Sequence, residues 1–161
     1  MSVNELMRTE DASLSKFAVV HMITEDNRRL KMLMCKNFEA KANVKTKALP
    51  RMGATVEAHR ATGVTLSLKM TIYKCTEEFD KMVDNFIKTG VMPKFQIQCT
   101  NEDPSTVGTI GRSDKVYNGC ILDGDVLLSL AGSEEDYIEQ EINGYAEGVE
   151  TPERYRNPEY M

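Results

Sequence analysis

The residues best suited to metal or thiol chemistry are few, and their spacing does not gather them into a site. The cysteines are scattered along the chain, at Cys35, Cys75, Cys99 and Cys120. None belongs to a C-x-x-C pair, and the two histidines, His21 and His59, lie far apart. Zinc sites need such ligands at short, regular spacings. We therefore predict no metal site and interpret the cysteines as free thiols of a reducing compartment.

Catalytic motifs do not emerge from the carboxylates or glycines either. Glu139 and Glu141 lie two residues apart on one strand face, but solvated strand residues are the simpler interpretation. The segment "GTIGR" lacks the lysine of a phosphate-binding loop, and "DGD" has too few carboxylates at ligand spacing for a cation. A Cys–His pair could still meet in space, although nothing local supports it. The sequence predicts no catalytic residue, no cofactor and no enzyme.

Length and composition describe an ordinary globular chain. Its 161 residues fit one domain, with 41% hydrophobic and 28% charged residues. No apolar run approaches the roughly 20 residues that cross a bilayer, and the start of the chain has no apolar core of a signal peptide. We predict a protein that is made and folded in a cytoplasm and does not insert into membranes.

Charge is divided unequally along the chain. Residues 1–100 hold 16 Lys and Arg against 11 Asp and Glu, a net +5, and residues 101–161 hold 4 against 14, a net −10; together they give −5. Two solvated faces would explain this split, and so would a basic surface of one copy that meets an acidic surface of the next. The overall negative charge disfavours binding to nucleic acid.

Two segments alternate strictly and predict long strands with polar backs. In "NFEAKANVKTK" every second residue from Phe38 to Val44 is apolar, and in "VTLSLKMTIYK" the same holds from Val64 to Ile72, with polar residues between them. The polar faces are Glu39, Lys41, Asn43 and Lys45 in the first, and Thr65, Ser67, Lys69 and Thr71 in the second. Such a face is typical of a sheet that borders a solvent space or another copy of itself.

Weaker signals place the other strands and loops. Residues 17–23 and 30–35 predict a hairpin, 95–100 a strand and 101–111 a loop. Asp123-Gly124 between apolar runs predicts a second hairpin. The strand at 137–145 carries Glu139 and Glu141 and is polar on both faces, which fits an edge, a channel wall or a contact with a neighbour. Residues 48–63 predict a long loop or extended arm, and 148–161 a tail.

One helix is predicted at about residues 77–88. Phe79, Met82, Val83, Phe86 and Ile87 form an apolar stripe that must pack on a sheet. Thr76 is the expected N-cap and Gly90 the expected C-cap. The predicted fold is therefore mainly β, a sandwich or barrel of seven or eight strands with one flanking helix. We expect a leader or arm at 1–16, the domain at 17–150 and a tail at 151–161.

The order of these parts resembles the tail tube proteins of contractile-tailed phages, defective prophages and bacteriocin-like particles. The resemblance covers roughly residues 17–155. It lies in a His-x-x-Thr-Gly turn at 59–63, a Thr-rich strand that ends in Tyr73, the helix that opens with Phe79, and the Lys-x-Gly exit at 88–90. Downstream, "VYNGCILDGDVLLSLAGSEEDYIEQEINGYAEGVETPERY" is similar to the closing pattern of the same family.

The resemblance implies a structural subunit that forms stacked hexameric rings and a hollow tube. The polar strand faces, with Glu139 and Glu141, would line the lumen or contact the neighbouring strand. The loop at 48–63 would take part in ring stacking through Arg51, Glu57, His59 and Arg60. Expected partners are further copies of the chain, the tail sheath, the baseplate or tube initiator and the tape-measure protein, with DNA as a possible passenger. The expected place is a virion tail or tail-like particle assembled in the bacterial cytoplasm.

A monomeric β-barrel that holds a small apolar ligand is the alternative. Such a barrel needs an apolar interior pocket, whereas the predicted strand backs are Thr, Lys, Glu, Gln and Asn.

Overall fold

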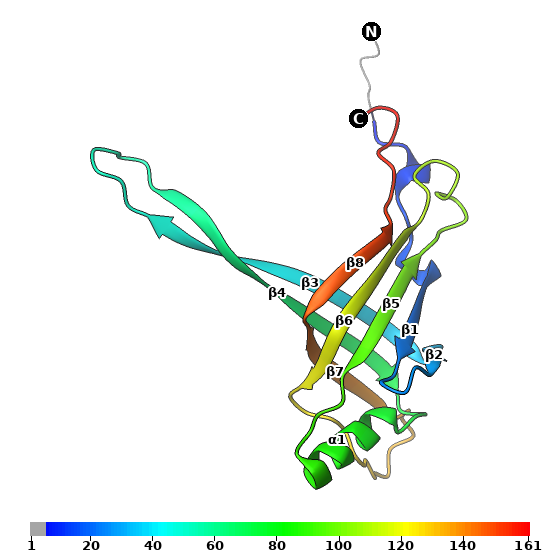
Figure 1. Ribbon diagram of the computed structural model, residues 1–161. Helices are drawn as coiled ribbons and strands as arrows, with labels where there is room; N and C mark the ends of the chain where they lie inside the picture. The colour runs from blue at the N-terminus through cyan, green and yellow to red at the C-terminus, as the bar shows by residue number, and fades with distance from the viewer. Residues whose placement is uncertain (1–5) are drawn as a thin grey trace. The chain divides into compact units, whose positions relative to one another are not determined.

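The computed structural model describes residues 6–161 and confirms the mainly β fold (Figure 1). It contains eight strands, one α-helix and two short 3-10 helices. The 3-10 helices are η1 (Thr9–Asp11) and η2 (Ser15–Phe17), and the α-helix is α1 (Glu78–Thr89). The strands are β1 (Ala18–Ile23), β2 (Arg29–Lys31), β3 (Cys35–Leu49), β4 (Ala58–Tyr73), β5 (Phe95–Asn101), β6 (Ser113–Asp123), β7 (Glu139–Ala146) and β8 (Gly148–Glu153).

The chain divides into two compact units. Within residues 6–161, the first consists of residues 6–33, 94–119 and 149–161, and the second of 34–93 and 120–148. Strand β6 contributes its first part to the first unit and its last residues to the second. Hydrogen-bonded neighbours follow the order β2-β1-β5-β6 in the first unit, where β8 also pairs with β6, and β6-β7-β4-β3 in the second.

The first unit confirms the hairpin at the start of the chain. Ile23 pairs with Arg29 and His21 with Lys31 in the antiparallel pair β1–β2, and the turn between them uses Asn27 at a positive φ of 62°. Strand β1 also pairs with β5 along its whole length. The core of this unit consists of buried apolar side chains, namely Val20, Met22, Met32, Phe95, Ile97, Ile110 and Tyr117.

Asp103 secures the segment before β1. Its carboxylate accepts hydrogen bonds from the backbone N–H of Leu14, at 2.8 Å, and of Ser105, at 2.9 Å. These two bonds favour the charged form and lower the pKa of Asp103 below its usual range. The predicted loop at 101–111 is therefore present, with a buried carboxylate that links it to residues 6–17.

The second unit is built on three strands in continuous register. Glu39 faces Lys69 across β3–β4, and Lys69 faces Asn143 across β4–β7. Alternate residues point to the opposite face, where Leu68, Met70, Ile72 and Ile142 are buried. The predicted alternation of these strands is thus confirmed, with the apolar set turned to the core.

Helix α1 confirms the predicted helix but not its apolar stripe. Gly90 is the C-cap, in the left-handed region at φ 75°, and its N–H bonds to the carbonyl of Phe86. Phe79 and Met82 are buried, whereas Phe86 is 46% and Ile87 71% exposed. Only the first turns of the stripe are buried in the single chain, so the prediction that the whole stripe packs is wrong. Among residues 6–161, no helix is long and apolar enough to span a membrane.

Three further predictions differ from the structure. Asp123-Gly124 is not a hairpin turn, because β6 ends at Asp123 and residues 124–138 run without a strand to β7. Strand β7 is not an edge, since it pairs with β4 along its length and with β6 at Asn143–Tyr145. The loop predicted at 48–63 comprises only residues 50–57, because β3 and β4 continue further than their alternation predicts. Strand β8, across the predicted start of the tail, was not anticipated.

Candidate assembly surface

The predicted polar residues of three strands share one face of the second unit. In register, Lys41 lies opposite Ser67, Asn43 opposite Thr65, and Thr71 opposite Glu141. Directly paired residues of antiparallel strands point to the same side of a sheet. The structure therefore brings together all ten residues of the predicted lumen or inter-subunit face: Glu39, Lys41, Asn43, Lys45, Thr65, Ser67, Lys69, Thr71, Glu139 and Glu141.

The charges on this polar face are largely paired. The Lys41 Nζ lies 2.7 Å from Glu39, the Lys69 Nζ 3.4 Å from Glu141, and the Lys36 Nζ 3.2 Å from Glu139. The hydrogen bond from Lys41 lowers the pKa of Glu39, and Glu39 in turn raises the pKa of Lys41. These pairs are exposed, so each contributes little to stability. They leave a hydrated surface of alternating sign.

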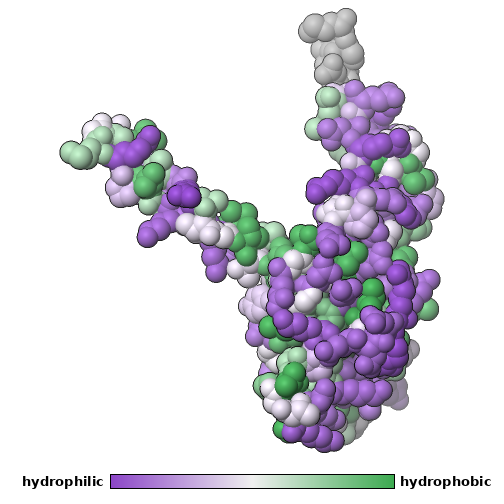
Figure 2. All heavy atoms as spheres, viewed as in Figure 1, coloured by the Kyte–Doolittle hydropathy of each residue, from purple (hydrophilic) through white to green (hydrophobic). Residues whose placement is uncertain are grey.

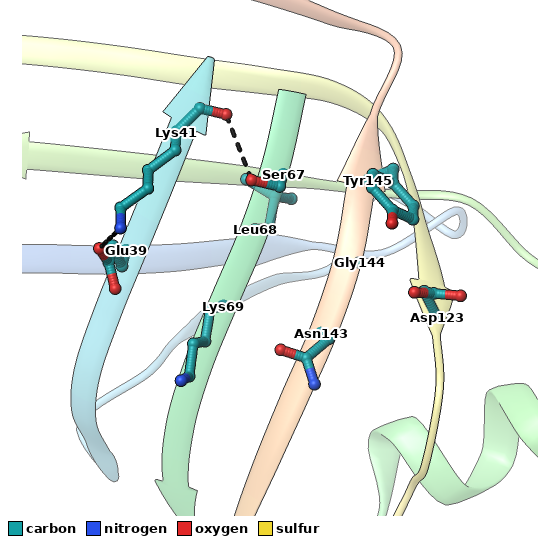
Figure 3. Close-up of a pocket in the computed structure, with 9 residues that line it drawn as sticks. All are labelled: Glu39, Lys41, Ser67, Leu68, Lys69, Asp123, Asn143, Gly144 and Tyr145. Atoms are coloured by element: carbon teal, nitrogen blue, oxygen red, sulfur yellow. Dashed lines mark hydrogen bonds and ion pairs between the residues drawn. The ribbon is translucent and has the colours of Figure 1, made fainter. Parts of the chain in front are cut away.

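A shallow pocket of about 320 Å³ lies on the same face (Figure 3). The side chains of Lys41, Lys69 and Asn143 lie around it with that of Asp123, and a hydrogen bond joins the Ser67 hydroxyl to the Lys41 carbonyl at 3.4 Å. Sites for small apolar ligands are lined mainly by hydrophobic side chains. This pocket offers charges and amides, which does not match the alternative of a barrel that binds an apolar ligand.

Strands β3 and β4 continue beyond the three-stranded sheet as a two-stranded hairpin (Figure 1). Strand β4 pairs with β7 only from Leu66 onward, so residues 58–65 pair with β3 alone. Val44 and Val64 face each other on the hairpin and are 55% and 58% exposed. Figure 2 shows apolar and polar residues side by side along this hairpin. An isolated two-stranded hairpin is marginal in water, so its exposed apolar surface calls for a partner.

The four residues predicted for ring stacking lie at the end of this hairpin. Arg51 and Glu57 belong to the 50–57 loop, while His59 and Arg60 belong to β4. A β-bulge at Thr62 interrupts the register, and the Thr62 hydroxyl bonds to the Lys45 carbonyl at 3.3 Å. The bulge puts Arg60 on the face of Lys45 and leaves His59 on the opposite face. The structure therefore separates these two neighbours.

The outer edge of β3 is open along the whole strand. Strand β3 ends the strand order of the second unit, and within residues 6–161 only β4 pairs with it. Its 15 residues leave a row of backbone N–H and C=O groups without a strand partner. An edge of this length is a hazard for aggregation unless another chain covers it.

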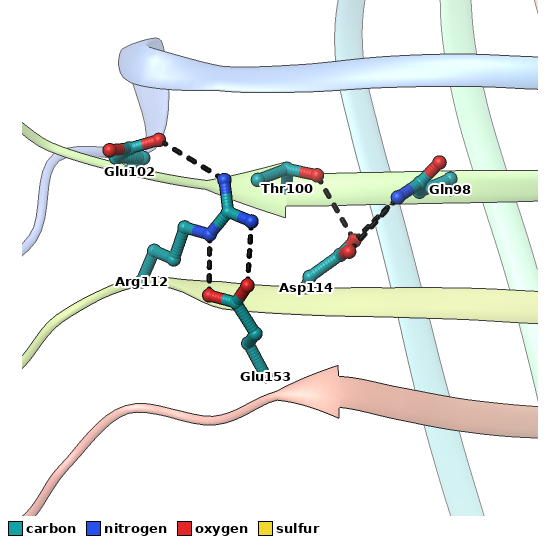
Figure 4. A network of polar contacts seen from close by, with 6 residues as sticks. All are labelled: Gln98, Thr100, Glu102, Arg112, Asp114 and Glu153. Carbon is teal, nitrogen blue, oxygen red and sulfur yellow. Dashed lines mark hydrogen bonds and ion pairs between the residues drawn. The ribbon is translucent and has the colours of Figure 1, made fainter.

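A polar network on the first unit was not predicted (Figure 4). The buried Asp114 carboxylate accepts hydrogen bonds from Gln98, at 2.9 Å, and Thr100, at 3.0 Å. Arg112 pairs with Glu153 of β8 and with Glu102, and the hydrogen bonds that it donates to Glu153 lower the pKa of that carboxylate. The alternation of polar residues in β5 was the only available signal. The network connects β5, β6 and β8 and is satisfied internally, which indicates a structural role.

Comparison with known proteins identifies a family and several relatives of this chain. The model of a family described as phage tail tube protein matches residues 5–153. Two proteins of Bacillus subtilis (strain 168) align over most of the chain. The uncharacterized protein YqbM is 26% identical over 128 residues, which cover 78% of this chain and 84% of YqbM. The phage-like element PBSX protein XkdM is 24% identical over 124 residues, which cover 76% of this chain and 82% of XkdM.

A solved structure shares the fold despite low identity. It is a chain of the sheath–tube complex of PVC, an extracellular contractile injection system, in the extended state. The TM-score is 0.64 at 12% identity, and the match covers 89% of this chain and 93% of the other. This chain therefore shares its fold with that chain.

Proposed function

The chain belongs to the phage tail tube protein family, and on this premise we propose that it polymerises as stacked hexameric rings into the inner tube of a contractile tail or tail-like particle. The proposed role is passive. The tube is a hollow conduit that crosses the target cell envelope when the sheath around it contracts, and no catalysis is involved.

The open edge of β3 is the observation that supports this proposal most directly. Neighbouring subunits that pair along this edge join their sheets around a ring and remove the exposed edge. A ring of this kind uses one heterologous contact repeated until it closes. Where all three strands pair, the polar face of β3, β4 and β7 then faces the water-filled bore, where paired charges and amides need no apolar cover.

The partners of such a tube follow from the same proposal. Further copies of the chain form the rings, and a sheath, a baseplate or initiator and a tape-measure protein surround, start and measure the tube. Its place is a phage virion or a tail-like particle, with synthesis and assembly in the bacterial cytoplasm. The likeness to XkdM of a phage-like element and to a chain of a sheath–tube complex supports this assignment. DNA and no cargo at all are both compatible with a bore of mixed charge.

Negative-stain electron microscopy of the purified chain over a concentration series tests the proposal. We expect rings or hollow tubes whose end views show six subunits. A monodisperse monomer at every concentration and salt level would contradict spontaneous polymerisation.

Two proline variants test the role of the open edge. Adjacent residues of a strand point their N–H groups to opposite edges, and proline removes that donor. Of Ala42→Pro and Asn43→Pro, one therefore removes an N–H from the open edge and the other disrupts the pairing with β4. We expect one variant to keep the denaturation midpoint of the monomer but lose tubes. Tubes from both variants would show that β3 does not join subunits.

A further inference from the structure

The projecting hairpin carries an unbalanced positive charge. Residues 41–60 contain five Lys and Arg but one acid, Glu57. The bulge at Thr62 places Arg60 directly opposite Lys47, on the face that also carries Lys45. Like charges in direct cross-strand positions repel each other. No ion pair neutralises Lys45, Lys47 or Arg60 within the part of the chain that the structure describes. We call Lys45, Lys47 and Arg60 the basic face of the hairpin.

The complementary charge lies in the connection between β6 and β7. Residues 116–153 contain ten Asp and Glu and no Lys or Arg. Within them, Glu134, Glu135 and Asp136 are consecutive and exposed. Glu139 and Glu141 are already paired with lysines of their own chain, whereas these three carboxylates make no ion pair within residues 6–161. We call residues 124–138 the acidic connection.

The acidic connection is held in place, and it also exposes apolar side chains. The Lys74 backbone N–H donates to the Ile138 carbonyl at 2.8 Å, and the Lys74 ammonium donates to the Leu127 carbonyl. Tyr137 packs edge-on against the Tyr73 ring at 6.2 Å between centroids and is still 87% exposed. Leu128 and Leu130 are exposed as well. Loops of this length without regular structure are usually functional, and this one presents both acidic and apolar groups.

These two surfaces lie at opposite ends of one strand. Strand β4 begins at Ala58, beside the hairpin loop, and ends at Tyr73, which pairs with Glu139 directly after the acidic connection. At about 3.3 Å per residue, its 16 residues separate the two ends by about 50 Å. The basic face therefore cannot reach the acidic connection of its own chain. A second copy, shifted along the strand direction, can bring them together.

We propose that the basic face of the hairpin of one subunit docks on the acidic connection of a second copy. The inference rests on the proposed tube, because such a contact between unlike surfaces repeats from copy to copy and builds a stack of rings. Lys45, Lys47 and Arg60 meet Glu134, Glu135 and Asp136. Leu49, which shares the basic face, and Met52 in the hairpin loop are exposed and meet the apolar side chains of the connection. Opposite charges then orient the two subunits, and apolar contacts stabilise the stack.

Zero-length cross-linking of the wild-type chain tests this contact directly. A carbodiimide couples a lysine amine to a carboxylate only when the two are in contact. In a 1:1 mixture of ¹⁴N- and ¹⁵N-labelled chains, we expect mixed-isotope peptides that join Lys45 or Lys47 to Glu134, Glu135 or Asp136. Intermolecular cross-links in assembled material that never include these residues would overturn the inference and leave the tube proposal intact. A chain that never assembles would contradict both.

Charge reversal with restoration supplies an independent readout. Lys45→Glu/Lys47→Glu and Glu134→Lys/Glu135→Lys each convert attraction into repulsion, and we expect the critical concentration for sedimentable tubes to rise about tenfold. Mixing the two variants pairs a basic surface with an acidic one only where unlike variants meet, whereas the combined quadruple variant pairs them at every contact and is therefore the proper test. It should return to within about threefold of the wild type. Lys88→Glu, an exposed lysine of α1, is the matched control and should change little. Tubes from both double variants at the wild-type concentration would refute the contact.

Discussion

Replacing Gly144 with alanine should open the junction between β6 and β7. Gly144 is buried and pairs with Leu122, and it shares the polar pocket wall with Asn143. A Cβ at this position would lie 2.3 Å from the carbonyl oxygen of Ile121. Because the obstacle is backbone, no side-chain rotation relieves the clash. The two strands must separate.

The size of the effect follows from that distance. A carbon and an oxygen settle at about 3.3 Å, so the strands must move apart by about 1 Å. Hydrogen bonds of about 2.9 Å would then lengthen beyond the distance at which they contribute. The β6–β7 pairing spans three residue pairs, Ile121–Tyr145 to Asp123–Asn143. Losing two or three bonds at about 1 kcal/mol each gives a loss of about 2 to 3 kcal/mol in the free energy of unfolding.

Urea denaturation of the unassembled chain, followed by circular dichroism, measures this loss. With a denaturant slope of about 2 kcal/mol per molar, the midpoint should fall by about 1 M. Gly148→Ala in β8 is the control, because an added Cβ there meets no atom within 4 Å. That variant should keep its midpoint or gain slightly from a less flexible unfolded chain. Equal midpoints for Gly144→Ala and the wild type would refute the close approach of the two strands.

Three further predictions concern the cores and buried charges. Phe79→Ala should lower the free energy of unfolding by about 3 to 5 kcal/mol, and the half-exposed Phe86→Ala by about 1 kcal/mol or less, in the same urea assay; equal losses would contradict the burial pattern of α1. Lys74→Met should lower the free energy of unfolding by about 3 to 5 kcal/mol, because it leaves the carboxylate of Asp80 buried without its partner; the two groups are 3.0 Å apart and their side chains are 10% and 13% exposed. A variant that also carries Asp80→Leu should recover most of the loss, and no recovery would refute the pairing. Asp103→Asn should destabilise the protein near neutral pH, and the difference from the wild type should shrink as the pH falls below the usual carboxylate value of about 3.9. The reason is that a lowered carboxylate pKa gives stability that is present above the usual value and is lost as the pH falls through the folded pKa. A difference that stays the same in acid would refute the role of the charge.

Strict alternation made the second unit predictable. In β3 and β4 the period of two identifies both faces, and it correctly grouped Glu39 to Lys45 with Thr65 to Thr71. Helix α1 was predictable for a similar reason, since its stripe and Gly90 act within one element. In each case the signal is local, and the structure adds only the partner strand. The polar face of the candidate surface could therefore be listed before its register was known.

Failures came where a local signal competes with a distant partner. Asp123-Gly124 is a strong hairpin dipeptide, and Gly124 does adopt a positive φ of 78°. The strand that pairs with β6 is nevertheless β7, where Gly144 lies close to the backbone of Ile121. The exposed Phe86 and Ile87 escaped prediction for the same reason. A periodic stripe shows which side of a helix is apolar but not how far the sheet beneath it extends.

The bulge at Thr62 determines which side chains of β4 share a face with Lys45 and Lys47. Strict alternation alone would assign them to the wrong faces. By strict alternation from Thr65, the polar face of β4 would continue through Ala61 and His59, and Arg60 would point to the apolar side. The extra residue reverses the phase, so Arg60 lies opposite Lys47 and the positive charges collect on one side. That arrangement is unfavourable for an isolated hairpin, because the like charges repel each other and no acidic side chain within residues 6–161 pairs with them. In the proposed stack an acidic surface of a second subunit covers these charges, and we therefore propose that the bulge serves assembly rather than the fold of the single chain.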